Sequence, residues 1–116
     1  MSGQASLILK ILKVELEEVE NDVAALEQFY EQRFRKDEIT NYVWQENKAL
    51  LAEEICCVKH LVKDLEAWKP PEAVGADDLL SLIRDFLYSL IDARRYPGLV
   101  RAVVDRKIEK VARYVD

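Results

Sequence analysis

Glycine and proline are both scarce in this sequence, with three residues of each in a chain of 116. The glycines stand far apart, at positions 3, 75 and 98, so no segment offers the glycine-rich loop that cradles phosphate groups. Two of the prolines are adjacent, at positions 70 and 71, which leaves most of the chain without a residue that breaks helices. The scarcity of both residues favours long helices and excludes a phosphate-binding glycine loop.

Long uncharged apolar runs are also missing, because charged residues make up 34% of the chain. A membrane-spanning helix needs about 20 consecutive apolar residues, so we expect no membrane association. The apolar N-terminal segment 6–16 is interrupted by Lys10 and Lys13, and no small-residue cleavage site follows it. We therefore do not interpret this segment as a targeting signal.

The two cysteines, Cys56 and Cys57, are neighbours in the chain. Adjacent cysteines cannot readily bridge each other inside a helix, so they provide no disulfide framework. Free thiols are typical of a reducing compartment, which predicts a cytoplasmic location.

The charges are distributed unevenly along the chain, whose formal net charge is −5. Residues 1–69 hold nine basic against fourteen acidic side chains, whereas residues 84–116 hold eight basic against five acidic ones. The front of the chain is therefore acidic and its tail basic. This asymmetry allows the two parts to attract each other, within one chain or between subunits.

Apolar residues recur at alternating spacings of three and four in the first third of the chain, which is the pattern of a heptad seam. The seam consists of Leu9, Leu12, Leu16, Val19, Val23, Leu26 and Tyr30. It predicts one long helix over residues 5–35. A helix of that length needs a partner helix, because packing rather than propensity provides most helical stability.

A second helix is predicted over residues 41–68, where Asp37, Thr40 or Asn41 can cap its start. Lys48 occupies the one seam position that should be apolar. The seam residues are Trp44, Leu51, Ile55, Val58, Val62 and Leu65, and a flanking apolar row consists of Leu50, Cys57, Leu61 and Trp68. The short polar turn between the two long helices predicts an antiparallel, coiled-coil-like hairpin.

Two shorter helices are predicted after a linker at residues 69–78, the first over 78–95 and the second over 97–115. Apolar residues surround most of the 78–95 helix, so we expect it to be central. We expect one all-α domain over residues 1–116: a long hairpin with two shorter C-terminal helices, resembling a four-helix bundle. The short pair cannot cover the whole hairpin, so oligomerisation is predicted to complete the bundle.

The only histidine lies close to both cysteines, which raises the question of a metal site. Glu53, Cys56 and His60 are spaced so that they can share one ion on a helix surface. A zinc site needs four ligands, or three and a water molecule, and the chain holds no second cysteine or histidine pair. We therefore favour packing for this segment and expect no cofactor.

A run of acids in the first long helix suggests a magnesium site of the kind that binds nucleotide triphosphates. Glu17, Glu18 and Asp22 are the candidate ligands, but Asn21 stands where a third acid of an E-E-x-x-E motif should be. One alternative function is therefore a divalent-metal-dependent, all-α nucleotide pyrophosphohydrolase-like enzyme with a degenerate carboxylate motif. The other interpretation of these acids is a solvated helix face that selects a partner.

The basic tail offers a second alternative, an accessory subunit of a nucleic-acid-processing complex. The candidate phosphate contacts are Arg94, Arg95, Arg101, Arg106, Lys110 and Arg113. The overall negative charge and the lack of a known binding motif count against direct nucleic-acid binding. Pairing of these bases with the acidic first helix is the competing explanation.

The favoured function is that of a non-enzymatic interaction or assembly protein, acting through helix–helix contacts with a second copy, as a dimer, or with another helical protein. The predicted interface residues are Leu9, Leu16, Val23, Tyr30, Trp44, Leu50, Leu61 and Trp68.

Overall fold

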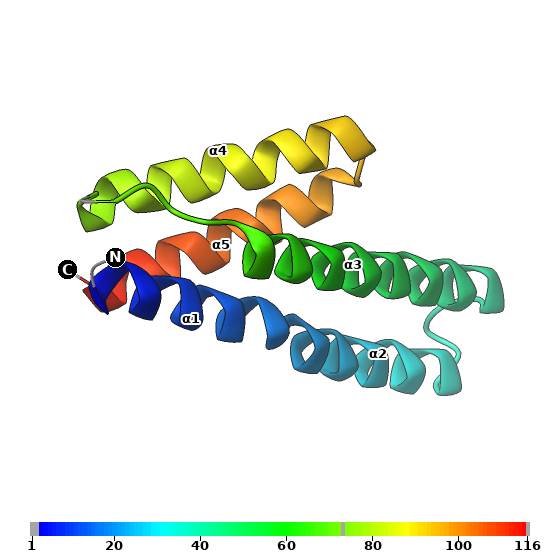
Figure 1. The fold of residues 1–116 in the computed structure, drawn as a ribbon. Helices are drawn as coiled ribbons and strands as arrows, with labels where there is room; N and C mark the ends of the chain where they lie inside the picture. Colours follow the sequence, from blue (N-terminus) through cyan, green and yellow to red (C-terminus); the bar gives the residue numbers. More distant parts are fainter. Residues whose placement is uncertain (1–2, 73, 116) are drawn as a thin grey trace.

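The computed structural model describes residues 3–72 and 74–115, and within them the fold is all-α, as predicted (Figure 1). Its helices are α1 (Gly3–Glu17), α2 (Val19–Arg35), α3 (Asn41–Ala67), α4 (Ala76–Arg94) and α5 (Gly98–Val115). None of these helices, over the residues described, is long and apolar enough to cross a membrane.

The first long helix is interrupted at Glu18, which separates α1 from α2, whereas the seam predicted an unbroken helix over 5–35. The ψ angle of Glu18 is −17°, shallower than the helical value of about −42°. Backbone hydrogen bonds continue across it, since Glu18 donates to Val14 at 3.0 Å and Asp22 donates to Glu18 at 3.1 Å. The interruption is therefore local, and α2 continues α1 in nearly the same direction (Figure 1).

Helix α3 returns antiparallel to α1 and α2 after a short turn. Thr40 is its cap, because the Thr40 hydroxyl oxygen accepts a hydrogen bond from the backbone N–H of Val43 at 3.2 Å. Asp37, another predicted cap, instead adopts a positive φ of 59° within the turn. Phe34 and Trp44 stack across the end of the hairpin with ring centroids 6.1 Å apart.

Helices α4 and α5 form a second, shorter antiparallel hairpin. Asp77 and Asp78 lie in the first turn of α4, where their negative charges interact favourably with the positive end of the helix dipole. Helix α4 ends at Arg94, and Arg95 follows in the left-handed conformation with φ 54°. Helix α5 starts at Gly98, directly after Pro97, which cannot continue the preceding helix.

The central helix of the C-terminal pair is α5, so the expectation that the 78–95 helix would be central was wrong. Helix α5 packs against α1, α3 and α4, whereas α4 lies at the edge of the molecule (Figure 1). Leu79, Ile83 and Leu87 of α4 are buried against its neighbours, while Leu82 is 38% exposed. Part of the apolar surface of α4 therefore faces solvent. Another flank of α4 is covered by Trp68, which stacks on Phe86 with ring centroids 5.6 Å apart.

The molecule divides into two parts along its 56 Å length. One part, which we call the base, has four helices in cross-section: α1, the C-terminal part of α3, α4 and α5 (Figure 1). The other part, which we call the arm, is the hairpin over residues 23–53, formed by α2 and the N-terminal part of α3. In Figure 1 the arm projects beyond the ends of α4 and α5, so it has only two helices in cross-section.

Candidate interaction surface

A buried group of charges joins α1 and α2 to α5 within the base. The side chains of Glu15 and Lys107 are only 10% and 8% exposed, with a carboxylate oxygen 3.6 Å from the ammonium nitrogen. Lys107 also lies 3.3 Å from Asp22 of α2, and Lys110 lies 3.0 Å from Glu15. The hydrogen bond to Glu15 raises the pKa of the Lys110 ammonium. The acidic first helix and the basic last helix thus pair within one chain, as the competing explanation proposed.

Glu54 of α3 is a second buried acid and lies on the same side of the hairpin. Its burial raises the pKa of the Glu54 carboxyl group, the nearby Arg106 of α5 lowers it, and Asp22 raises it again. The net effect is a raised pKa, so burial outweighs the attraction of Arg106. The charged form of Glu54 therefore costs folding free energy.

Glu54→Gln should stabilise the protein at neutral pH by an amount on the order of 1 kcal/mol, because the neutral amide avoids the desolvation of a buried carboxylate. When folding raises the pKa of a carboxyl group, the folded protein loses stability as the pH rises from the pKa of the unfolded chain, about 4, through the pKa of the folded state. The gain from the substitution should therefore be absent below about pH 4 and reach its full size at neutral pH. Thermal unfolding measured across this pH range tests the prediction.

Glu53→Gln is the matched control, because Glu53 is the exposed neighbour of Glu54 on the same helix. This control should leave the midpoint of unfolding nearly unchanged at every pH. A gain from Glu54→Gln that stayed constant down to acid pH would show that burial of the charge is not its cause.

Four large apolar side chains of the arm, and Leu99 at the start of α5, lie on the side that continues the face covered by α5 in the base. Asp22 and Glu54 mark that face, because both lie next to α5 residues. Side chains three, four, seven and eleven residues apart share one side of a helix. Leu26 and Phe29 follow Asp22 by four and seven residues on α2, and Leu50 and Val43 precede Glu54 by four and eleven residues on α3. On α5, Leu99 precedes Arg106 by seven residues. We call the surface formed by Leu26, Phe29, Val43, Leu50 and Leu99 the arm patch. Each is between 38% and 52% exposed.

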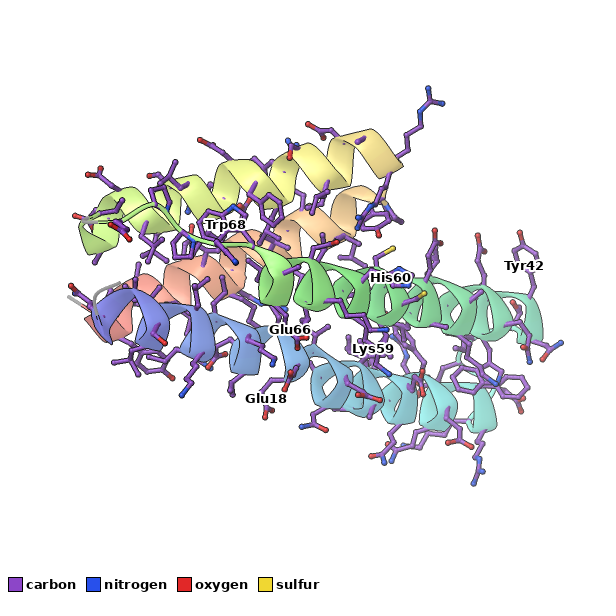
Figure 2. The ribbon with its side chains drawn as sticks, in the orientation of Figure 1. Glu18, Tyr42, Lys59, His60, Glu66 and Trp68 are labelled. Atoms are coloured by element: carbon purple, nitrogen blue, oxygen red, sulfur yellow. The ribbon has the colours of Figure 1, made fainter. Side chains whose placement is uncertain are left out.

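The opposite side of the hairpin carries a groove of about 600 Å³ between the α1–α2 junction and α3. Its floor is apolar, but charged side chains cross it: Lys59 lies 3.5 Å from Glu20, and Lys13 lies 2.7 Å from Glu66 farther along. Figure 2 shows Lys59 and Glu66 on the side of α3 that faces α1 and α2. A helix that entered this groove would have to displace these ion pairs, so the groove is a weaker docking surface than the arm patch.

The predicted interface residues divide into three groups by exposure. Leu16, Val23 and Leu61 are buried in the core of the chain itself. Leu9, Tyr30, Trp44 and Trp68 are half-buried; among them Trp44 stacks on Phe34, and Trp68 stacks on Phe86. Leu50 is 49% exposed and belongs to the arm patch. Of this predicted set, Leu50 has the largest exposed fraction.

The candidate metal ligands are not brought together. Within residues 3–72 and 74–115, no three histidine, cysteine or acidic side chains are placed to hold a metal ion. Glu53, Cys56 and His60 are exposed on α3, and Figure 2 shows His60 on its surface. Cys57 is buried, as predicted, and its burial raises the pKa of the thiol, which disfavours the reactive thiolate.

The acidic candidates for a magnesium site make contacts of other kinds. Glu17 and Glu18 are exposed, and Glu18 accepts a hydrogen bond from the side-chain amide of Asn21 at 3.1 Å. Asp22 is paired with Lys107. Asn21, which replaces the third acid of the motif, thus binds one of the carboxylates that a metal would need.

Several of the candidate nucleic-acid contacts are already paired with acids of the chain. Arg94 binds both carboxylate oxygens of Asp64, at 2.6 and 3.2 Å, and Arg101 binds Asp92 at 2.8 Å. Lys110 is paired with Glu15, and Arg106 lies near Glu54. Arg95 and Arg113 are exposed. Phosphate binding by this set would therefore compete with ion pairs that join the helices.

Three buried charged residues, Glu15, Glu54 and Lys107, were not recognised from the sequence. The signal that could have identified Glu54 is its position in the flanking apolar row, four residues after Leu50 and three before Cys57. Lys107 likewise follows the buried Val103 by four residues. A charged residue within an apolar row on one helix predicts a buried partner of opposite charge on another.

Comparison of the chain with protein-family models, with curated proteins and with solved structures gave no match. The function is therefore inferred from the chain's own geometry, in which two features stand out. One is the buried pairing of acidic and basic helices in the base, and the other is the exposed arm patch.

Proposed function

We propose that this protein is a non-enzymatic helical assembly protein whose arm patch docks onto helices of another subunit. The observation that carries the proposal is the gathering of Leu26, Phe29, Val43 and Leu50 on one side of a two-helix arm, next to Leu99 of α5. Soluble proteins seldom leave several large apolar side chains contiguous and exposed unless the surface binds something.

The arm is also the part of the chain that gains most from being covered. In the base, the hairpin is packed against both α5 and α4, whereas the arm has only its own two helices. Helices derive most of their stability from the packing of an apolar face. A partner that covered the arm patch would therefore stabilise the arm in the way that α5 stabilises the base.

The charged surfaces support assembly rather than catalysis. Among the described residues most acid–base pairs join two helices, as Lys107 with Glu15 and Arg94 with Asp64, whereas Arg35 with Glu31 pairs within α2. Such pairs hold helices in register and leave the apolar patch as the surface available to a partner.

Phe29→Glu should abolish association, because it places a carboxylate in the centre of the arm patch, where a docked helix would desolvate it. Light scattering after size-exclusion chromatography measures the effect. We expect the wild-type chain to exceed its monomer mass of 13.5 kDa and the variant to run as a folded monomer.

Val14→Glu is the matched control, because Val14 is 55% exposed on α1, outside the arm. We expect this variant to associate like the wild type. A wild-type chain that stays monomeric, or an association that Phe29→Glu leaves intact, would contradict the proposed role of the arm patch.

A further inference from the structure

A pocket lies between α1, the end of α3 and the linker that leads to α4. Its volume of about 540 Å³ is within the range of sites that hold small molecules. Figure 2 shows Glu66 and Trp68 at this end of α3. We call this cavity the linker pocket, and its apolar wall consists of Leu9, Leu65, Trp68 and Pro70.

The apolar wall of the linker pocket is anchored in the core of the base. Leu65 is buried, and Leu9 and Trp68 are half-buried and packed against the core. Phe86 stacks on Trp68 but does not line the pocket, so the indole ring is held by α4 on one side and borders the pocket on another. The pocket therefore offers a fixed apolar surface to a ligand.

Lysine side chains surround this apolar wall. Ser6, Lys10 and Lys13 are spaced by four and three residues, so one side of α1 presents all three to the pocket. Lys69 is contributed by the linker. Lys13 is paired with Glu66 at 2.7 Å, whereas Lys10 and Lys69 form no ion pair with a described residue. Two ammonium groups are thus available to a ligand.

The charges of the linker pocket complement a ligand with one negative charge. Glu72 also lines it, so its three lysines exceed its two glutamates by a single positive charge. A polyphosphate carries more negative charge than this, and the described lining residues include no arginine, the side chain that binds phosphate with two parallel hydrogen bonds. In the groove at the α1–α2 junction, by contrast, three glutamates outnumber two lysines. Of these two cavities, the linker pocket is the one that favours an anion.

We propose that the linker pocket binds an amphiphilic monocarboxylate, a molecule with an apolar chain and a single carboxylate group. The apolar chain packs against Leu65 and Trp68, where it is removed from water. The carboxylate lies among the lysines, and Ser6 and Lys10 are one helical turn apart, so the hydroxyl and the ammonium group can donate to the same carboxylate. The linker pocket and the arm patch share no residue, so this inference goes beyond the proposed assembly function and does not depend on it.

The fluorescence of Trp68 tests the proposed site. The chain holds two tryptophans, so Trp44→Phe leaves Trp68 as the only one. This variant is titrated with octanoate, with octanol, which lacks the charge, and with acetate, which lacks the chain. We expect a saturable change of fluorescence with octanoate, at least fivefold weaker binding of octanol, and no change with acetate.

The lysines are tested in the same background by Lys10→Gln and Lys69→Gln. Each substitution should raise the dissociation constant of octanoate by about two- to fivefold, as expected for exposed charges, and the effect should weaken with added salt. Lys63→Gln is the matched control, because Lys63 is an exposed lysine that lines the other groove. This control should leave octanoate binding unchanged.

Saturable binding of octanoate that depends on Lys10 or Lys69, but not on Lys63, supports the inference. Octanol that bound as tightly as octanoate would overturn it, because the pocket would then select the chain without the charge. A response to acetate equal to that to octanoate, or no saturable response to octanoate, would also overturn it. None of these results depends on whether the chain associates, so the proposed assembly function stands or falls separately.

Discussion

Leu12→Ala should lower the free energy of unfolding by about 3–5 kcal/mol, because it opens a cavity in the part of the core that neighbouring helices enclose most completely. Leu12 is fully buried on α1, the helix that packs against α2, α3, α4 and α5. A protein of this size is stable by roughly 5–15 kcal/mol, so the variant should retain the fold only marginally. Chemical denaturation monitored by circular dichroism measures the change.

Leu7→Ala provides the control on the same helix, since the Leu7 side chain is 54% exposed. Its removal should cost less than about 1 kcal/mol, because little buried surface is lost. Equal costs for the two substitutions would mean that α1 does not occupy the centre of the base.

Lys107→Met should lower the free energy of unfolding by about 3 kcal/mol, because it removes one partner of a buried ion pair and leaves Glu15 with less compensation. Glu15→Met should have a similar cost, for it leaves the ammonium group of Lys107 buried beside Asp22 alone. The double variant should recover most of the loss, because two methionines of similar volume replace the pair without leaving a buried charge. A double-mutant cycle by chemical denaturation measures this coupling.

Lys13→Met is the control for the ion-pair prediction, because Lys13 pairs with Glu66 at 2.7 Å while both side chains stay 40% or more exposed. Its loss should cost less than about 1 kcal/mol. Additive costs for Glu15→Met and Lys107→Met would show that the two buried charges do not stabilise each other.

Helices α3 and α5 could be predicted because each carries an apolar row at helical spacing and is bounded by a strong local signal, whereas no such signal marks the break at Glu18 between α1 and α2. Helix α3 was predicted over 41–68 and spans Asn41–Ala67, since Thr40 caps its start and Pro70 and Pro71 follow its end. Helix α5 was predicted over 97–115 and spans Gly98–Val115, directly after Pro97. These features depend on residues close together in the chain, so they can be recognised without tertiary information.

The exposure of individual residues could not be predicted from the same rows, because it depends on where other helices end. Leu26 continues the seam of Val19 and Val23, yet it is 44% exposed because it lies on the arm, beyond the cover of α5. Lys107 was assigned to no buried position, yet α1 and α2 place two acids against it. Burial of a charge depends on a partner on another helix, which a row on one helix does not show.

The position of the candidate site was predicted only in part for the same reason. The widened apolar face of α3 indicated that the hairpin needs a further partner, and Leu50 of that face lies in the arm patch. Its flanking neighbours Cys57 and Leu61 are instead covered within the chain. Only the three-dimensional arrangement shows that α4 and α5 cover one half of the hairpin and leave the other half open (Figure 1).

Amide hydrogen exchange, measured at low and high protein concentration, tests most directly whether the arm patch is the docking surface. Local protection reports how firmly each helix is packed. Docking at the arm patch predicts that exchange slows with concentration in residues 24–34 and 42–52, while α4 stays unchanged. An exchange rate in the arm that is the same at all concentrations, or protection that rises only in the base, would contradict docking at the arm patch.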